Sequence, residues 1–425
     1  MMRKPWKKGA CAAYARPMAA SKPVTLATTE RLPALDAMRG ATVLGILAVN
    51  IHFFRDMPLG EILEGGEAGV RLLSDRVVEA FTGALAAGTS LGLFAFLFGV
   101  GMAMQLSRET GGRFGSARIL VAQRMVWLLL IGLAHHQFVT VDILLLYAML
   151  GFVLIILAGP ALPPPRFWQY SLGAVGLLLL VLVPLLAANW EAGPLGGALL
   201  PDRGEAAGAQ LAAGNAAERL EARALETMAG QGSSSFAIQA LGWMLVGLAF
   251  GWAGGLRWLQ GPARRLLRVG IASLVAGAVC RGLLALPAAA PGPYAGPDGV
   301  VGAFAVAGTL LLVVGFGATM AGLGLWFRDR GRPLRRLEAV GRMALSAYLM
   351  QSVIVLSLLA VPPVAAAMTA TTGLLLLLVV WGLLLVICPW WLRRFRFGPV
   401  EWLWRSLTYL RVQPLKVPAR AESRP

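Results

Sequence analysis

Residues 124–151 read RMVWLLLIGLAHHQFVTVDILLLYAMLG, two apolar runs that are joined by a short polar turn. A helix needs about 20 mostly apolar residues to cross the hydrocarbon core of a bilayer. Within lipid the backbone must be helical, because no water is present to satisfy its polar groups. The stretch therefore predicts a tight transmembrane hairpin with helices over 119–136 and 138–158.

The composition extends this interpretation to the whole chain. Of its 425 residues, 57% are hydrophobic and 14% are charged, and the mean hydropathy is +0.69. A soluble protein has about 25% charged residues and could not bury this much apolar surface. Cys11, Cys280 and Cys388 are far apart and fit no metal-ligand spacing, so neither a metal site nor a disulfide framework is expected. Soluble enzymes, disordered proteins and disulfide-rich secreted domains are thereby excluded.

Further apolar runs predict an all-α fold, a polytopic bundle of about ten transmembrane helices. The runs cover residues 34–54, 84–106, 119–136, 138–158, 168–189, 236–255, 266–287, 300–326, 339–361 and 372–392. Residues 34–410 are expected to form a single transmembrane domain. Basic tails over 1–33 and 411–425 flank it, and 190–235 is the longest loop. Translation from Met18 fits the sequence as well as translation from Met1.

Positive charge marks one side of this bundle. Lysine and arginine gather in the two tails and in the loops after the second, sixth and eighth runs. Cytoplasmic loops carry an excess of these residues, so both termini are predicted to be cytoplasmic and the 190–235 loop external. The net charge of +17 follows from this topology. It is not the clustered basic stripe with aromatics of a nucleic-acid interface, and no nucleic-acid partner is expected.

Polar residues inside the first run need a reason, because a charge at the bilayer centre costs about 2.5–3.5 kcal/mol on insertion scales. Asp36 and Arg39 are three residues apart, so they share a helix face and can pair. Asn50 lies eleven residues after Arg39 and returns to nearly the same face. Two interpretations remain open. The pair anchors the helix at the interface, or this face lines a cavity.

The turn of the hairpin holds His135 and His136, and Asp142 lies just inside the returning helix. An imidazole beside a carboxylate is the arrangement that a general base needs. The alternative is a hydrogen-bonded histidine at the membrane interface. Tyr348, Gln351 and Ser352 form a polar stripe of the kind that commonly makes interhelical hydrogen bonds. The residues predicted to line a polar cavity are Asp36, Arg39, Asn50, Tyr147, Tyr348 and Gln351.

Five motifs occur in order along the chain. They are LDAMRG…LGILAVNI, FAFLFGVGMAM, IGLAHH…DILLLYAMLG, GRMALSAYLMQSVI and FRFGPVEWLWRSLTY. The set resembles the YeiB-like family of bacterial membrane proteins that carry DUF418. It covers about Arg31 to Leu410, and the part from about 225 to 410 carries the last two motifs. The resemblance implies a multi-pass protein of the cell inner membrane. Val141 stands where family members usually have glycine, and His136 is not part of the pattern.

The first motif is also similar to that of membrane acyltransferases, which move an acyl group from a cytoplasmic donor to an acceptor across the bilayer. This similarity implies acyl-CoA as a co-substrate, no bound cofactor, and a hydroxyl or amine of a small molecule or glycan as the acceptor. O-acyltransferases have a histidine where this chain has Asn50, so the base would be His135 or His136. We predict His135 and Asp142 as the catalytic pair, with Arg39 on the donor's phosphates or its carbonyl region. A small-solute transporter and a non-enzymatic membrane protein are the alternatives.

Overall fold

The computed structural model describes residues 32–51, 88–107, 116–139, 142–191, 234–285, 299–327, 334–361, 363–364 and 369–417. Among these residues the regular structure is helical, apart from one isolated bridge between Phe395 and Lys416. The start at Met1 or Met18, nearly all of the two tails and most of the 190–235 loop lie outside the described residues. The predicted all-α class is confirmed for the part that the structure describes.

Twelve helices of eight or more residues build this part of the chain, together with the short α12 (Gly255–Trp258). They are α1 (Pro33–Asn50), α4 (Thr89–Leu106), α5 (Ala117–His136), α6 (Ile143–Leu157), α7 (Arg166–Glu191), α11 (Ser234–Trp252), α13 (Ala263–Ala285), α14 (Gly299–Trp326), α15 (Arg335–Arg342), α16 (Ala344–Leu359), α18 (Ala370–Leu392) and α19 (Pro399–Tyr409). Nine of the ten predicted apolar runs overlap one of these helices each within the described residues, and the ninth, 339–361, divides into α15 and α16. In the run 138–158 the helix begins only at Ile143, after the Asp142 cap.

Five of the described helices are long and apolar enough to cross a membrane by length and composition, namely α4, α5, α7, α14 and α18. A sixth span results if α15 and α16 are taken together, and α6 and most of α11 are apolar but shorter. These helices are those of a membrane protein. Length and composition alone thus support five or six spans in the described residues, fewer than the ten predicted.

The ninth apolar run is not the single straight helix that its hydropathy predicts. It breaks at Met343, and α15 and α16 are bent by 88° relative to each other. Four of the eight residues of α15 are charged, which disfavours placing it across a hydrocarbon core. Met343 itself adopts φ −111° and ψ 30°, outside the helical region. The break gives α16 a separate N-terminus inside the bundle.

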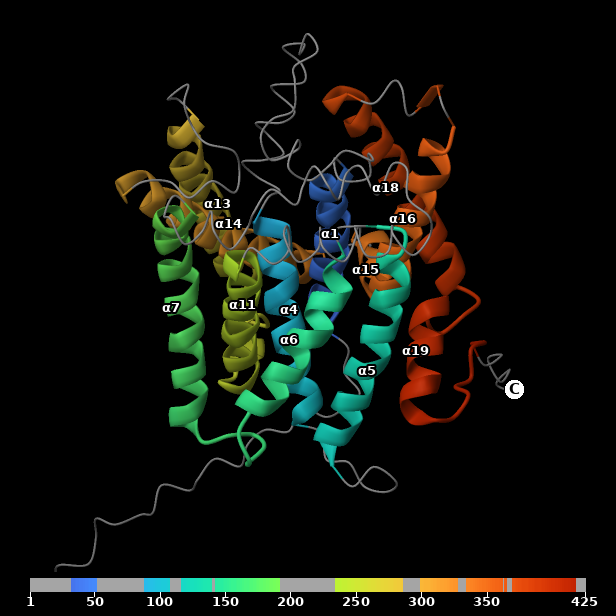
Figure 1. Cartoon of the computed structure of the whole chain (residues 1–425), viewed down its shortest axis with the longest axis horizontal. Helices are drawn as coiled ribbons and strands as arrows, with labels where there is room; N and C mark the ends of the chain where they lie inside the picture. Colours follow the sequence, from blue (N-terminus) through green and yellow to red (C-terminus); the bar gives the residue numbers. More distant parts are fainter. Residues whose placement is uncertain are drawn as a thin grey trace, which may run out of the picture. The chain divides into compact units, whose positions relative to one another are not determined.

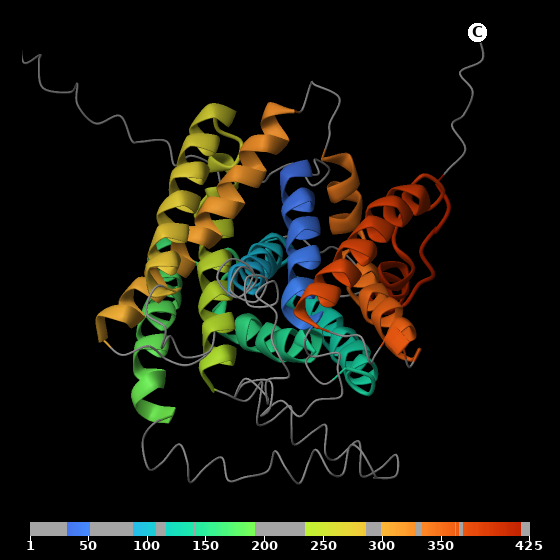
Figure 2. The same ribbon diagram turned by 90° about the horizontal axis from the view of Figure 1, so that it is seen from above.

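The helices fall into two groups that meet at α1 and α4 (Figures 1 and 2). Helices α7, α11, α13 and α14 pack on one side, and α15, α16, α18 and α19 pack on the other. The α5–α6 hairpin contacts α4 with both of its helices and contacts α19 through α5. Helix α1, with its polar face, therefore lies next to α4, which the hairpin contacts, and next to the α15–α16 bend.

Two glycines allow α1 and α15 to touch through their backbones. A Cβ atom at Gly40 would lie 2.1 Å from the carbonyl oxygen of Leu337, and one at Gly341 would lie 1.8 Å from that of Asp36. Membrane helices commonly approach closely where small residues face each other. The same contact occurs between α4 and α11, where Gly99 faces Met244 and Gly247 faces Phe96. The glycines of the LDAMRG and GRMALS motifs are thus packing residues.

Substituting Gly341→Ala is expected to destabilise the fold by about 1–3 kcal/mol, the usual cost of overpacking, because the added methyl group meets backbone atoms. Thermal unfolding of the purified protein in detergent measures the effect. Gly382→Ala is the matched control, since a Cβ atom there has nothing within 4 Å. Equal midpoints for Gly341→Ala and Gly382→Ala would show that α1 and α15 are not in backbone contact.

Candidate functional site

The hairpin turn brings His135 and Asp142 together. His135 lies in the last turn of α5, and Asp142 is the N-cap of α6, where its Oδ1 accepts a hydrogen bond of 3.1 Å from the Leu144 amide. Aspartate is a favoured N-cap because it satisfies an amide that has no partner within the helix. His135 Nδ1 lies 3.1 Å from the same oxygen, Asp142 Oδ1. The capping function thus fixes the carboxylate that faces the imidazole.

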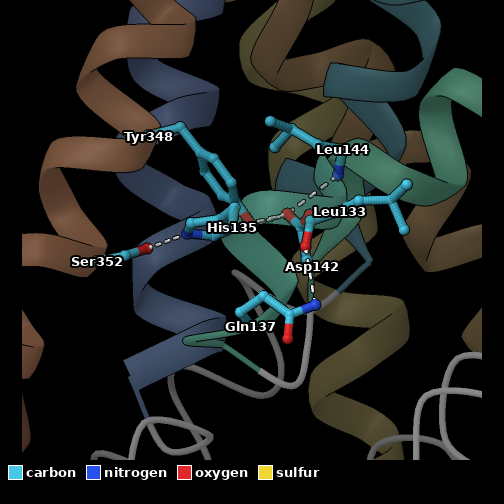
Figure 3. Close-up of polar contacts among 7 residues, drawn as sticks. All are labelled: Leu133, His135, Gln137, Asp142, Leu144, Tyr348 and Ser352. Atoms are coloured by element: carbon cyan, nitrogen blue, oxygen red, sulfur yellow. Dashed lines mark hydrogen bonds and ion pairs between the residues drawn. The ribbon is translucent and has the colours of Figure 1, made fainter. Parts of the chain in front are cut away.

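Helix α16 completes this cluster from the other side (Figure 3). Ser352 Oγ lies 2.8 Å from His135 Nε2, and the Tyr348 hydroxyl donates to Asp142 Oδ1 at 3.1 Å. The rings of Tyr348 and His135 lie 5.3 Å apart between centroids. His135, Asp142 and Ser352 are 8%, 1% and 3% exposed. Asp142 Oδ2 has no hydrogen-bond partner among the described residues.

A cavity of about 350 Å³ lies beside this cluster, bordered by residues of α1, α4, α5, α6, α15, α16 and α19. Its volume is at the lower end of the range for small-molecule sites, about 300–1,000 Å³. Four arginines and one glutamate line it, so the cavity has a positive charge. Its polar lining residues are Arg39, Gln105, Arg124, Tyr147, Arg342, Tyr348, Glu401 and Arg405.

Arg124 is held firmly at this cavity. Its side chain donates to Gln105 Oε1, and its guanidinium lies over the Trp404 ring at 4.7 Å from the centroid. The indole of Trp404 in turn donates to the Arg124 carbonyl at 2.9 Å. A planar guanidinium of this kind is well suited to bind phosphate. Arg124 precedes His135 by eleven residues on α5, about 16 Å along the axis.

The cavity also reaches the residues that hold Asp142. Ile143, Leu144 and Tyr348 line it. Leu144 and Tyr348 are the residues whose amide and hydroxyl bind Asp142 Oδ1. The cavity therefore extends from the arginines to the residues directly around the His135–Asp142 pair.

Glu401 fixes the start of α16. Its carboxylate accepts hydrogen bonds from the amides of Leu345 at 2.7 Å and Ser346 at 3.0 Å, and from the Ser346 hydroxyl. The first amides of a helix have no partner within the helix and favour a negative charge. Burial raises the pKa of the Glu401 carboxyl above the ordinary value, although the hydrogen bonds from Ser346 and Leu345 lower it. Helix α19 thus sets the position of the helix that carries Tyr348 and Ser352.

Comparison with known proteins identifies the family. Residues 241–411 match the family described as "Protein of unknown function (DUF418)". The uncharacterized protein YxaH of Bacillus subtilis (strain 168) is 30% identical, over 91% of this chain and 96% of its own length. The uncharacterized protein YeiB of Escherichia coli (strain K12) is 28% identical, over 89% of this chain and 96% of its own length. The chain belongs to the YeiB-like DUF418 family.

The DUF418 match covers only part of the candidate site. It includes Tyr348, Ser352 and Glu401, whereas His135 and Asp142 precede it. The relatives match over nearly their full length, so the family resemblance extends to the hairpin as well. The names of both relatives assign no activity. Any function for this member of the family must therefore come from the site itself.

The structure places some of the residues predicted to line a polar cavity at the cavity and others away from it. Arg39, Tyr147 and Tyr348 line the cavity, and Asp36 Oδ1 lies 3.4 Å from Arg39 Nη1. Gln351 is buried and donates to the Val43 carbonyl at 3.2 Å, an interhelical bond of the kind that its stripe indicates. Asn50 is 5% exposed on α1 and does not belong to the cavity lining.

Sequence reasoning missed several residues of the cavity, namely Gln105, Arg342, Glu401, Trp404 and Arg405. Four of them, Arg342, Glu401, Trp404 and Arg405, lie in motifs to which the sequence assigns no chemistry, and Gln105 directly follows another such motif. The position of Arg124 on the His135 face of α5 was the available signal. Among the described residues, no group of three or more His, Cys, Asp or Glu side chains could hold a metal ion.

Proposed function

We propose that the chain transfers an acyl group from a cytoplasmic acyl-CoA to a hydroxyl or amine at the opposite face of the membrane. The observation that carries the proposal is a cavity lined by four arginines that also reaches Leu144 and Tyr348, the two residues that bind Asp142 of the His135–Asp142 pair. A general base and an anion site joined by one cavity are what transfer from an anionic thioester needs.

The base would be His135. Asp142 Oδ1 lies 3.1 Å from Nδ1. In the tautomer with the proton on Nδ1, Nε2 would accept a proton from a hydroxyl or amine. The structure has a hydroxyl at this nitrogen, that of Ser352 at 2.8 Å. General-base help of this kind typically contributes about 10²–10⁴-fold to the rate.

The donor would enter from the arginine end. Arginine binds phosphate oxygens through paired, charge-assisted hydrogen bonds. A cavity of about 350 Å³ has room for the acyl-bearing arm of the donor, and its nucleotide would remain near Arg39, whose side chain is 31% exposed. Because the lysine- and arginine-rich loops are predicted to be cytoplasmic, this end would face the cytoplasm.

Burial favours transfer over hydrolysis. The His135 and Ser352 side chains are nearly inaccessible, at 8% and 3% exposure. A site that excludes water protects a reactive acyl group until the acceptor arrives. We therefore expect little release of free acid when no acceptor is present.

Transfer from [¹⁴C]acetyl-CoA tests the proposal in inside-out membrane vesicles that contain the full chain. Label should move to a vesicle component or an added amine sugar only when the chain is present. Sealed right-side-out vesicles should show no transfer, since the donor cannot reach the cytoplasmic face. Vesicles that contain folded protein and transfer no label would contradict the proposal. Solute uptake without acyl transfer would instead favour a transporter.

A further inference from the structure

We propose that Ser352 is the nucleophile of a Ser352–His135–Asp142 triad and carries the acyl group as an ester between donor and acceptor. This inference rests on the proposed function and deepens it. Direct transfer would need only His135, whereas the triad predicts a covalent intermediate on a named oxygen.

The distances are those of an activated serine. Nucleophile and base must lie within about 2.6–3.2 Å, and a third group must orient the base. Ser352 Oγ lies 2.8 Å from His135 Nε2, and Asp142 Oδ1 lies 3.1 Å from His135 Nδ1. The three side chains come from three elements, namely α16, α5 and the N-cap of α6 (Figure 3). Their order of contact, serine to imidazole to carboxylate, is that of the catalytic triad.

The neighbourhood of Ser352 differs from that of an ordinary interhelical bond. The side chain of Gln351, the preceding residue, donates a hydrogen bond to the backbone carbonyl of Val43. Ser352 instead contacts an imidazole whose other nitrogen faces a carboxylate. That carboxylate is oriented by the Leu144 amide and the Tyr348 hydroxyl, both on Oδ1. Asp142 also caps α6 through Oδ1, and its Oδ2 lacks a partner among the described residues.

The path of the acyl group follows α16. Tyr348 lines the cavity, and Ser352 lies one helical turn further along the same face, about 6 Å along the axis. The Tyr348 ring stands beside the His135 ring, at 5.3 Å between centroids. Because Ser352 does not line the cavity, the proposal requires the Tyr348 side chain to rotate away from Asp142 when the acyl arm enters.

The proposed transfer proceeds in two half-reactions, acylation of Ser352 and transfer to the acceptor. Ser352 Oγ attacks the thioester carbonyl carbon, and its proton moves to His135 Nε2. The carbon–sulfur bond then breaks, and the leaving thiolate takes this proton, so that free CoA and an acyl-serine result. The acceptor hydroxyl or amine next gives its proton to Nε2 and attacks the ester. The bond to Oγ breaks, and the proton returns to Ser352 as the acylated acceptor leaves.

Trapping of the intermediate tests the triad. Purified full-length protein in nanodiscs is mixed with [¹⁴C]acetyl-CoA without acceptor, quenched in acid and digested for mass spectrometry. We expect one acetyl group on the peptide that contains Ser352. Ser352→Ala should lose the label and at least 100-fold in transfer rate. Ser352→Cys should keep a label, now as a thioester that neutral hydroxylamine removes.

Two controls separate a lost nucleophile from a lost fold. Ser357→Ala changes an exposed serine of the same helix and should leave labelling and transfer unchanged. Ser352→Ala should bind CoA as the unchanged protein does, because Ser352 does not line the cavity.

The outcomes distinguish failure of the Ser352 triad from failure of the acyltransferase proposal. If the unchanged protein transfers acetyl groups, remains unlabelled and tolerates Ser352→Ala, the triad is wrong and direct transfer with His135 as the base stands. If folded protein neither transfers nor becomes labelled, the acyltransferase proposal fails as well. A label on another residue would overturn the role of Ser352 alone.

Discussion

Replacing His135 with alanine is expected to lower the rate of acyl transfer by about 10²–10⁴-fold, the usual contribution of a general base. The imidazole is the group that contacts both Asp142, at 3.1 Å, and Ser352, at 2.8 Å. The variant keeps the arginines of the cavity, so CoA binding should change little. Initial rates with [¹⁴C]acetyl-CoA measure the loss, after the amount of folded protein has been matched by size-exclusion chromatography.

His136→Ala is the matched control for this variant. His136 is also buried and adjacent, at 5% exposure, but the contacts with Ser352 and Asp142 belong to His135. We expect it to keep most of the activity. His135→Gln, which retains a donor for the buried carboxylate, should be as inactive as the alanine variant. Activity in His135→Gln near that of the unchanged protein would exclude His135 as the base.

Replacing Arg124 with alanine is expected to weaken CoA binding by about 10- to 100-fold, because a hydrogen bond to a charged group contributes about 1.5–3 kcal/mol. Arg124 is placed by Gln105 and Trp404, so its guanidinium is already ordered before the ligand arrives. Arg124→Lys should bind with intermediate affinity, since lysine keeps the charge but loses the planar fork. Equilibrium binding of CoA to the purified protein measures both variants.

Arg264→Ala is the control for charge alone. Arg264 lies on α13 near the Trp326 ring and is not part of the cavity lining. Its loss removes one positive charge from the chain without touching the candidate site. An equal loss of CoA affinity in Arg264→Ala and Arg124→Ala would mean that the ligand responds to overall charge, and the cavity would not be its site.

Hydropathy was enough to locate most of the fold. Each predicted run contains helix among the described residues, because lipid leaves no other way to satisfy the backbone. The bend at Met343 escaped prediction, since apolar residues lie on both sides of it, Ala339 and Val340 before and those of α16 after, with Gly341 and Arg342 between them. The charged residues of α15 indicate the break, but averaging the hydropathy over neighbouring residues hides them.

The candidate site was predictable where its residues are neighbours in sequence. Asp142 and His135 are seven residues apart around a short turn, so their contact follows from local geometry. Ser352 contacts His135 across 217 positions, and Glu401 reaches Ser346 across 55. Periodicity gives the face of a helix but not which helix it meets. Such distant partners become visible only once the bundle is assembled.

An experimental structure with a thioether analogue of acetyl-CoA, determined in a nanodisc, tests the link between the arginine cavity and the histidine most directly. We expect the phosphates of the analogue to contact Arg39 and Arg124, with its acyl carbon near His135. The acyl carbon should lie within about 3–3.5 Å of a hydroxyl held by His135 Nε2, the separation of reacting atoms in a near-attack arrangement. An analogue bound outside this cavity, or a His135 side chain that faces lipid away from Arg124, would contradict the proposed acyl transfer.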